Sequence, residues 1–138
     1  MYISIRAITL ASLAVIGVDI VWGFLLIGLF GAPAFDSSLP NEQILAAMQV
    51  LQQDTRYLTC GLIFGTASTV LGGFLAARLA GALAYFNALG FGIVGLVLNG
   101  LTLGDVPTWF KVSSLALTLP AALLGGHIAK QRSSTGQP

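Results

Sequence analysis

Residues 57–79 read YLTCGLIFGTASTVLGGFLAARL, a run in which Arg78 is the only charged side chain. At 1.5 Å of rise per residue, a helix of this length crosses the roughly 30 Å hydrocarbon core of a bilayer. Three further apolar segments of similar length occupy residues 7–30, 83–104 and 109–129. The sequence therefore predicts an all-α integral membrane protein, a bundle of four transmembrane helices that residues 1–138 form as a single domain.

The composition excludes an ordinary soluble domain. Of the 138 residues, 56% are hydrophobic and 8% charged, and the mean hydropathy is +0.89. A soluble domain carries about 25% charged residues because water must wet its surface. The lipid bilayer is thus the expected surrounding, and a net charge of +1 gives no reason to expect a nucleic acid partner.

The charges predict the orientation of the chain. Basic residues dominate the N-terminus, the second connection and the C-terminal tail, namely Arg6, Arg78, Lys130 and Arg132. The acidic residues of the first and third connections are Asp36, Glu42, Asp54 and Asp105, accompanied by Arg56 and Lys111. Because positive charge favours the cytoplasmic side, we expect both termini to be cytoplasmic.

The first outer connection is long enough to hold a short helix. Ser38-Leu39-Pro40 supplies a candidate N-cap followed by proline in the first turn. After it, Ile44, Leu45, Met48 and Leu51 share one face at helical spacing. This pattern predicts an amphipathic helix on the membrane surface or on the bundle, and the alternative is an N-terminal extension of the second span.

Small residues recur along three of the expected helices, on faces where another backbone can approach closely. The second helix carries Gly61, Gly65, Thr69 and Gly73, the third carries Gly92 and Gly95, and the fourth carries Gly125. We interpret these seven positions as helix-packing residues within the bundle. The alternative is that one of the stripes contacts a second subunit.

The second and fourth helices also end alike. Residues 71–76 read LGGFLA and residues 124–129 read LGGHIA, and a basic residue follows each soon after. The match suggests two duplicated helical hairpins related by an axis along the membrane normal. A chance match is the alternative, because leucine, glycine and alanine dominate the chain.

The stretch LGGFLAARLAG at 71–81, followed by NALG at 87–90, resembles a pattern of small uncharacterised bacterial four-helix membrane proteins. In that pattern a Gly-Gly pair, a basic residue and often a histidine precede the third span. Asn87 stands here at the position of the histidine. The resemblance implies the plasma membrane of a bacterium, its inner membrane, and implies no activity.

Residues able to carry chemistry are few. The sequence contains no established catalytic, cofactor-binding or metal-binding motif, so we assign no catalytic residue, cofactor or metal. Asp19 interrupts the first apolar segment near its middle, where an acid costs roughly 2.5–3.5 kcal/mol to insert and is therefore expected to face protein or water. Its functional interpretation is a proton or cation site, and its structural interpretation is a hydrogen-bonded acid that orients helix packing. Asn87, Asn99 and His127 are the other candidates, each with a packing or capping role as the alternative.

These features favour a non-enzymatic role. The first hypothesis is a structural or accessory subunit that works as a homo-oligomer or within a larger membrane complex, because small-residue seams are abundant and polar chemistry is scarce. The second hypothesis is a channel or transporter for protons or small ions that uses Asp19.

Overall fold

The computed structural model describes residues 3–31 and 38–134, and these ranges form five α-helices. The helices are α1 (Ile5–Phe30), α2 (Asn41–Leu51), α3 (Thr55–Ala80), α4 (Ala84–Thr102) and α5 (Thr108–Ser134). The protein is thus all-helical, as predicted, and α1, α3, α4 and α5 are long and apolar enough to cross a membrane. Asp36, one of the acidic residues used for the orientation, lies outside the described residues.

Local chemistry sets where the helices begin and end. The Ser4 hydroxyl accepts a hydrogen bond from the backbone N–H of Ala7 at 3.2 Å, which caps α1. The Asp54 carboxylate accepts from the N–H groups of Arg56 and Tyr57 at 2.7 and 3.1 Å and caps α3. At its other end α3 stops at Gly81, whose φ of +66° lies in the left-handed region that glycine adopts without strain.

Helix α2 is separate from the second span, so the alternative of an N-terminal extension is wrong. Asp54 caps a new helix after the short break that follows Leu51, and a chain redirected there cannot continue one helix into the next. The expected cap is also wrong: α2 begins at Asn41 with Pro40 at the cap position, where no side chain makes a capping hydrogen bond. Leu51 is buried at the end of α2, close to Gly31 at the end of α1.

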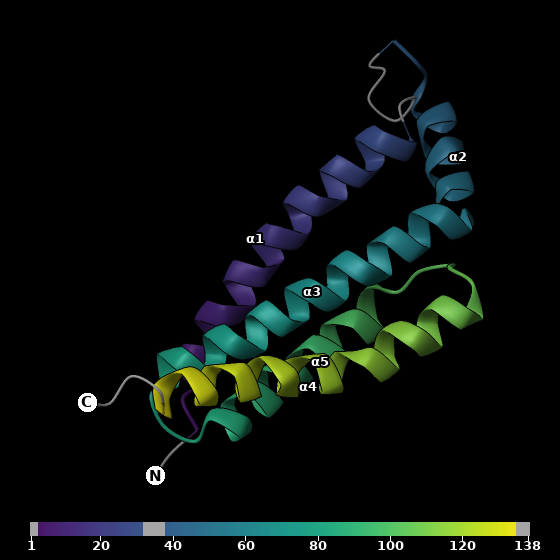
Figure 1. The fold of residues 1–138 in the computed structure, drawn as a ribbon. Helices are drawn as coiled ribbons and strands as arrows, with labels where there is room; N and C mark the ends of the chain where they lie inside the picture. Colours follow the sequence, from purple (N-terminus) through teal and green to yellow (C-terminus); the bar gives the residue numbers. More distant parts are fainter. Residues whose placement is uncertain (1–2, 32–37, 135–138) are drawn as a thin grey trace.

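The four long helices run alternately up and down, so that α1 begins and α5 ends at the same end of the bundle (Figure 1). The turn between α3 and α4 is so short that the two helices are antiparallel neighbours, as predicted. Helices α3 and α5 run in the same direction and make the most extensive contact in the molecule. Helix α1 packs mainly on α3.

Glycines allow α3 and α5 to approach closely. A Cβ added at Gly73 would collide with the backbone carbonyl of Ala122, and one added at Gly125 would collide with the backbone of Val70 and Phe74. The contact is reciprocal, because each helix offers a glycine to the other helix's main chain. Gly92 and Gly95 of α4 lie against α5 more loosely, since added Cβ atoms there would meet mostly side-chain atoms at 3.0–3.4 Å.

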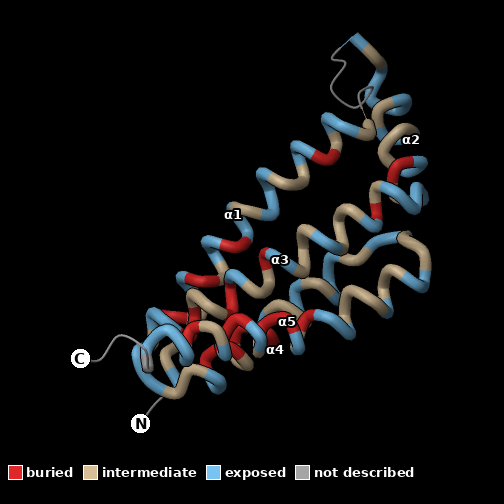
Figure 2. Tube along the Cα trace, viewed as in Figure 1, coloured by how far each residue is buried: buried red, intermediate tan, exposed pale blue. Residues whose placement is uncertain are grey.

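Tight packing is concentrated in the half of the bundle that contains the start of α1 and the end of α5 (Figure 2). A buried cluster there joins all four long helices and consists of Ala11, Val15, Ala76, Phe91 and Ala122. Toward the α2 end, α1 diverges from α3 (Figure 1). The stacked rings of Trp22 and Phe64, with centroids 4.2 Å apart, connect the two helices across this divergence.

Candidate functional site

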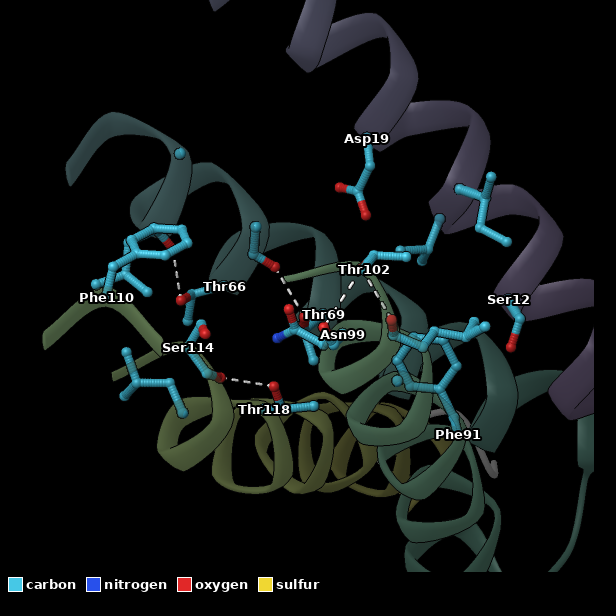
Figure 3. A pocket seen from close by; sticks show the side chains of 18 residues that line it. Ser12, Asp19, Thr66, Thr69, Phe91, Asn99, Thr102, Phe110, Ser114 and Thr118 are labelled. Atoms are coloured by element: carbon cyan, nitrogen blue, oxygen red, sulfur yellow. Dashed lines mark hydrogen bonds between the residues drawn. The ribbon is translucent and has the colours of Figure 1, made fainter. Parts of the chain in front are cut away.

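A cavity of about 480 Å³ lies between the four long helices, in the half of the bundle where α1 and α3 diverge (Figure 3). Its α3 lining comes from residues 61–69 and its α5 lining from residues 110–118, both in the part of the helix nearest α2 and the α4–α5 connection. Eight polar side chains line it, contributed by all four helices: Ser12, Asp19, Thr66, Thr69, Asn99, Thr102, Ser114 and Thr118. The cavity is thus a polar space within an otherwise apolar bundle.

The absence of two side chains on α3 helps to create this space. A Cβ added at Gly61 or Gly65 would meet no atom within 4 Å, and both glycines line the cavity. The prediction that these two glycines pack against a helix is therefore wrong. Thr69, from the same expected packing stripe, also faces the cavity. Four residues slightly exceed one turn of about 3.6 residues, so the stripe winds slowly around α3. It borders the cavity at Gly61 and Gly65 and meets α5 at Gly73.

Hydroxyl groups make the cavity wall a surface of hydrogen-bond acceptors. Five of them donate their hydrogen to a carbonyl of their own helix, at 2.7–3.0 Å: Thr66, Thr69, Thr102, Ser114 and Thr118. A hydroxyl that has donated its single hydrogen presents only lone pairs to anything else. Each of these oxygens can therefore accept a hydrogen bond from a molecule in the cavity, or coordinate a cation there.

Asp19 projects from the middle of α1 toward this wall (Figure 3). It is the one charged side chain among the described residues that line the cavity. Ser12, about two turns before it on α1, has a buried hydroxyl without a hydrogen-bond partner among the described residues. A carboxyl group with acceptor oxygens around it, and no basic lining residue, makes the cavity attractive to positive charge.

Asn99 is the second predicted candidate that the cavity includes. It lines the wall from α4, and its amide can both donate and accept hydrogen bonds. The cavity therefore brings Asp19 and Asn99 together, and it excludes Asn87 and His127. No pattern in the sequence predicts Ser12, Thr102 or Ser114 as site residues, because serine and threonine in an apolar helix commonly hydrogen-bond to their own backbone and do not indicate which face they share.

Asn87 has a structural position. Its side chain is fully buried, and its Oδ1 accepts a hydrogen bond from the backbone N–H of Ser4 at 2.8 Å. Its Nδ2 donates to the carbonyls of Ala82 and Leu83 at 2.9 and 3.1 Å. Asn87 thereby joins the start of α1 to the α3–α4 turn, in which Leu83 adopts a positive φ of 50°.

His127 is also held by neighbours away from the cavity. Its Nδ1 lies 2.7 Å from the hydroxyl of Tyr85, and its Nε2 lies 2.8 Å from Nε2 of Gln131. Both ring nitrogens therefore have hydrogen-bond partners at the exposed end of α5. The arrangement links α4 to α5 and leaves no ring nitrogen directed at a reacting group.

The cavity does not resemble a site for a transition metal or for calcium. Within residues 3–31 and 38–134, no three side chains from His, Cys, Asp and Glu lie close enough together to hold a metal ion. One carboxylate and several neutral oxygens instead suit a monovalent cation or a group that donates N–H or O–H hydrogen bonds.

Comparison of the chain with known proteins found no matching family, no matching curated relative and no matching solved structure.

Proposed function

We propose that this chain is an integral membrane protein that binds a small cation in the Asp19 cavity and carries it across the bilayer, as a channel or a transporter. The observation that carries this proposal is an acid at the middle of a membrane-length helix, directed into a cavity lined by acceptor oxygens from all four long helices. An intramembrane acid is costly unless water, protein or a bound cation compensates it. A cavity with this lining supplies that compensation.

The chemistry of the wall favours protons and monovalent cations as the transported species. Hydroxyl and amide oxygens can replace part of the hydration shell of such an ion, and the carboxylate supplies a compensating charge. An anion would meet the Asp19 carboxylate and the lone pairs of the hydroxyl groups, and no cationic side chain lines the described part of the cavity. The proposed pathway therefore selects cations over anions.

Flux measurements on purified protein in liposomes test this function. We expect Asp19→Asn to lower proton or monovalent-cation flux at least about tenfold, because it removes the charge and keeps the size of the side chain; a tenfold effect corresponds to about 1.4 kcal/mol. Asp105→Asn is the control, since Asp105 lies in the α4–α5 connection and does not line the cavity. Equal flux through Asp19→Asn and the unmodified protein would contradict the proposal.

A structural or accessory role, as a homo-oligomer or in a larger membrane complex, is the second candidate. The observation that favours it is the sparse packing of α1, of which only Ala7, Ala11, Val15 and Leu26 are buried. A second chain packed on α1 would cover its apolar face and close the side of the cavity next to Asp19. If the protein has the structural role and does not transport cations, the purified protein should form a defined oligomer and conduct no cation.

We further propose that the membrane is the inner membrane of a bacterium, with both termini in the cytoplasm. The support for the orientation is the distribution of charge. Among the described residues, the end with Arg6, Arg78, Lys130 and Arg132 has no acidic residue, whereas at the other end Arg56 and Lys111 accompany Glu42, Asp54 and Asp105. The bacterial inner membrane is supported by the resemblance of residues 71–81 and 87–90.

Reporter fusions test this orientation. We expect a reporter joined after residue 138 to report a cytoplasmic location, because four spans separate the two termini. A reporter inserted within α2 should report the outer side, because one span separates α2 from the N-terminus. Activity of both reporters on the same side would contradict either the four spans or their orientation.

A further inference from the structure

A second cavity lies at the basic end of the bundle, far along the helices from Asp19. This basic groove has a volume of about 390 Å³ and is bordered by the end of α3, the α3–α4 turn and the last turns of α5. The residues that matter for its chemistry are Arg78, Tyr85, Phe86, Lys130 and Ser133. Two cationic side chains from different helices thus share one concave surface.

Aromatic rings hold cationic groups at this end. The Nζ atom of Lys130 lies 5.0 Å from the centre of the Tyr85 ring, and Tyr85 is itself held by its contact with His127. The Cζ atom of Arg78 lies 5.8 Å from the centre of the Phe74 ring. Contacts of this kind orient a cation while leaving its N–H groups available to an anion.

No described residue that borders the groove is acidic, so none of them neutralises these charges. The four acidic residues of the described chain lie elsewhere, Asp19 at the first cavity and Glu42, Asp54 and Asp105 toward the opposite end. Helix α4 also begins at the groove without an acidic residue in its first turn and without a side-chain cap at Leu83. Its first N–H groups and the positive end of its dipole therefore add to the charge of Arg78 and Lys130.

An exposed apolar side chain borders the groove. Phe86 is one of its lining residues and is 57% exposed. A phosphate in the groove would thus lie next to surface that suits an acyl chain. This combination of a basic pocket and an apolar flank is the general form of a site for an anionic phospholipid.

We propose that the basic groove binds a phosphate group, and that its source is the headgroup of an anionic phospholipid. Arg78 and Lys130 bind the phosphate oxygens from two helices, while Phe86 contacts the lipid chains. The inference is independent of cation transport, because none of these residues lines the Asp19 cavity.

Lipid binding to the purified protein in a neutral detergent tests the proposal. Phosphatidylglycerol, phosphatidylcholine and glycerol phosphate are titrated separately, and bound lipid is read by native mass spectrometry. We expect phosphatidylglycerol to bind at least about tenfold more tightly than phosphatidylcholine, and the double variant Arg78→Gln/Lys130→Gln to lose this preference. The titration with glycerol phosphate distinguishes a lipid headgroup from a soluble phosphate, because a soluble phosphate ligand needs no acyl chain to bind with full affinity.

Two further variants make the outcome decisive. Arg6→Gln removes a positive charge from the same end of the bundle without touching the groove and should leave the preference intact, and Arg78→Lys, which keeps the charge, should retain most of it. Unchanged lipid preference in the double variant, or an equal loss in Arg6→Gln, would overturn the proposal. Equal affinity for glycerol phosphate and phosphatidylglycerol would overturn the lipid as the source.

Discussion

Replacing Gly73 with leucine is expected to destabilise the bundle by about 3 kcal/mol, at the upper end of the cost of an overpacked contact. The first atom of any side chain there would collide with the carbonyl of Ala122, and backbone cannot rotate away as a flexible side chain can. The two helices would have to separate along the most extensive contact of the molecule. Gly125→Leu should have a similar effect, because it meets the backbone of Val70 and Phe74.

Thermal unfolding in detergent measures this effect, and Gly65→Leu is the matched control. Gly65 lies on the same helix, two turns earlier, but an added Cβ there meets no atom within 4 Å. We expect the midpoint of Gly73→Leu to fall by about 10 °C, and that of Gly65→Leu to stay near that of the unmodified protein. If both variants melt alike, the close contact between α3 and α5 is not what stabilises the bundle.

Asn87→Leu is expected to cost about 3 kcal/mol, although the two side chains are similar in size. The substitution removes three hydrogen bonds at a fully buried side chain and leaves the N–H of Ser4 and the carbonyl of Ala82 without their partner, while the carbonyl of Leu83 keeps its bond from the backbone N–H of residue 87. Each unsatisfied buried group costs about 1–3 kcal/mol, part of which water at the helix ends recovers. The start of α1 and the α3–α4 turn should loosen together.

Asn99→Leu provides the comparison, because Asn99 lines the cavity instead of joining chain segments. We expect it to change the thermal midpoint little and to alter cation flux in liposomes. Hydrogen exchange at residues 81–87 should rise in Asn87→Leu and remain unchanged in Asn99→Leu. Equal stability of the two variants would show that Asn87 is dispensable for the turn.

The stripe of small residues on α3 illustrates what a periodic pattern can and cannot predict. Residues four apart are neighbours on a helix surface, so the pattern predicts one stripe through Gly61, Gly65, Thr69 and Gly73 along a side of α3. The pattern does not say what that side faces. Gly73 meets α5, whereas Gly61 and Gly65 border a cavity, because the stripe winds around α3 and the neighbouring helices differ along its length.

The sequence also predicts the positions of the polar candidate residues better than their surroundings. A mid-span acid is unusual enough to be noticed in the sequence, and Asp19 does line a polar cavity. Asn87 and Asn99 lie on the same helix and look alike in the sequence, yet Asn87 is buried against the α3–α4 turn and Asn99 lines the cavity wall. The two roles differ because α4 contacts different segments along its length. Segments that are distant from it in the sequence, such as the start of α1, take part in these contacts.

The sequence by itself determined the four long helices and their alternating directions, because apolar length and the short α3–α4 connection are local properties. It also determined that few groups carry charge near the middle of those helices. Only the tertiary structure decided where the helices touch and where they separate, since that depends on the match between backbone surfaces at Gly73, Ala122 and Gly125. The Asp19 cavity and the basic groove both arise from such long-range packing: each collects side chains from several helices that no local pattern brings together.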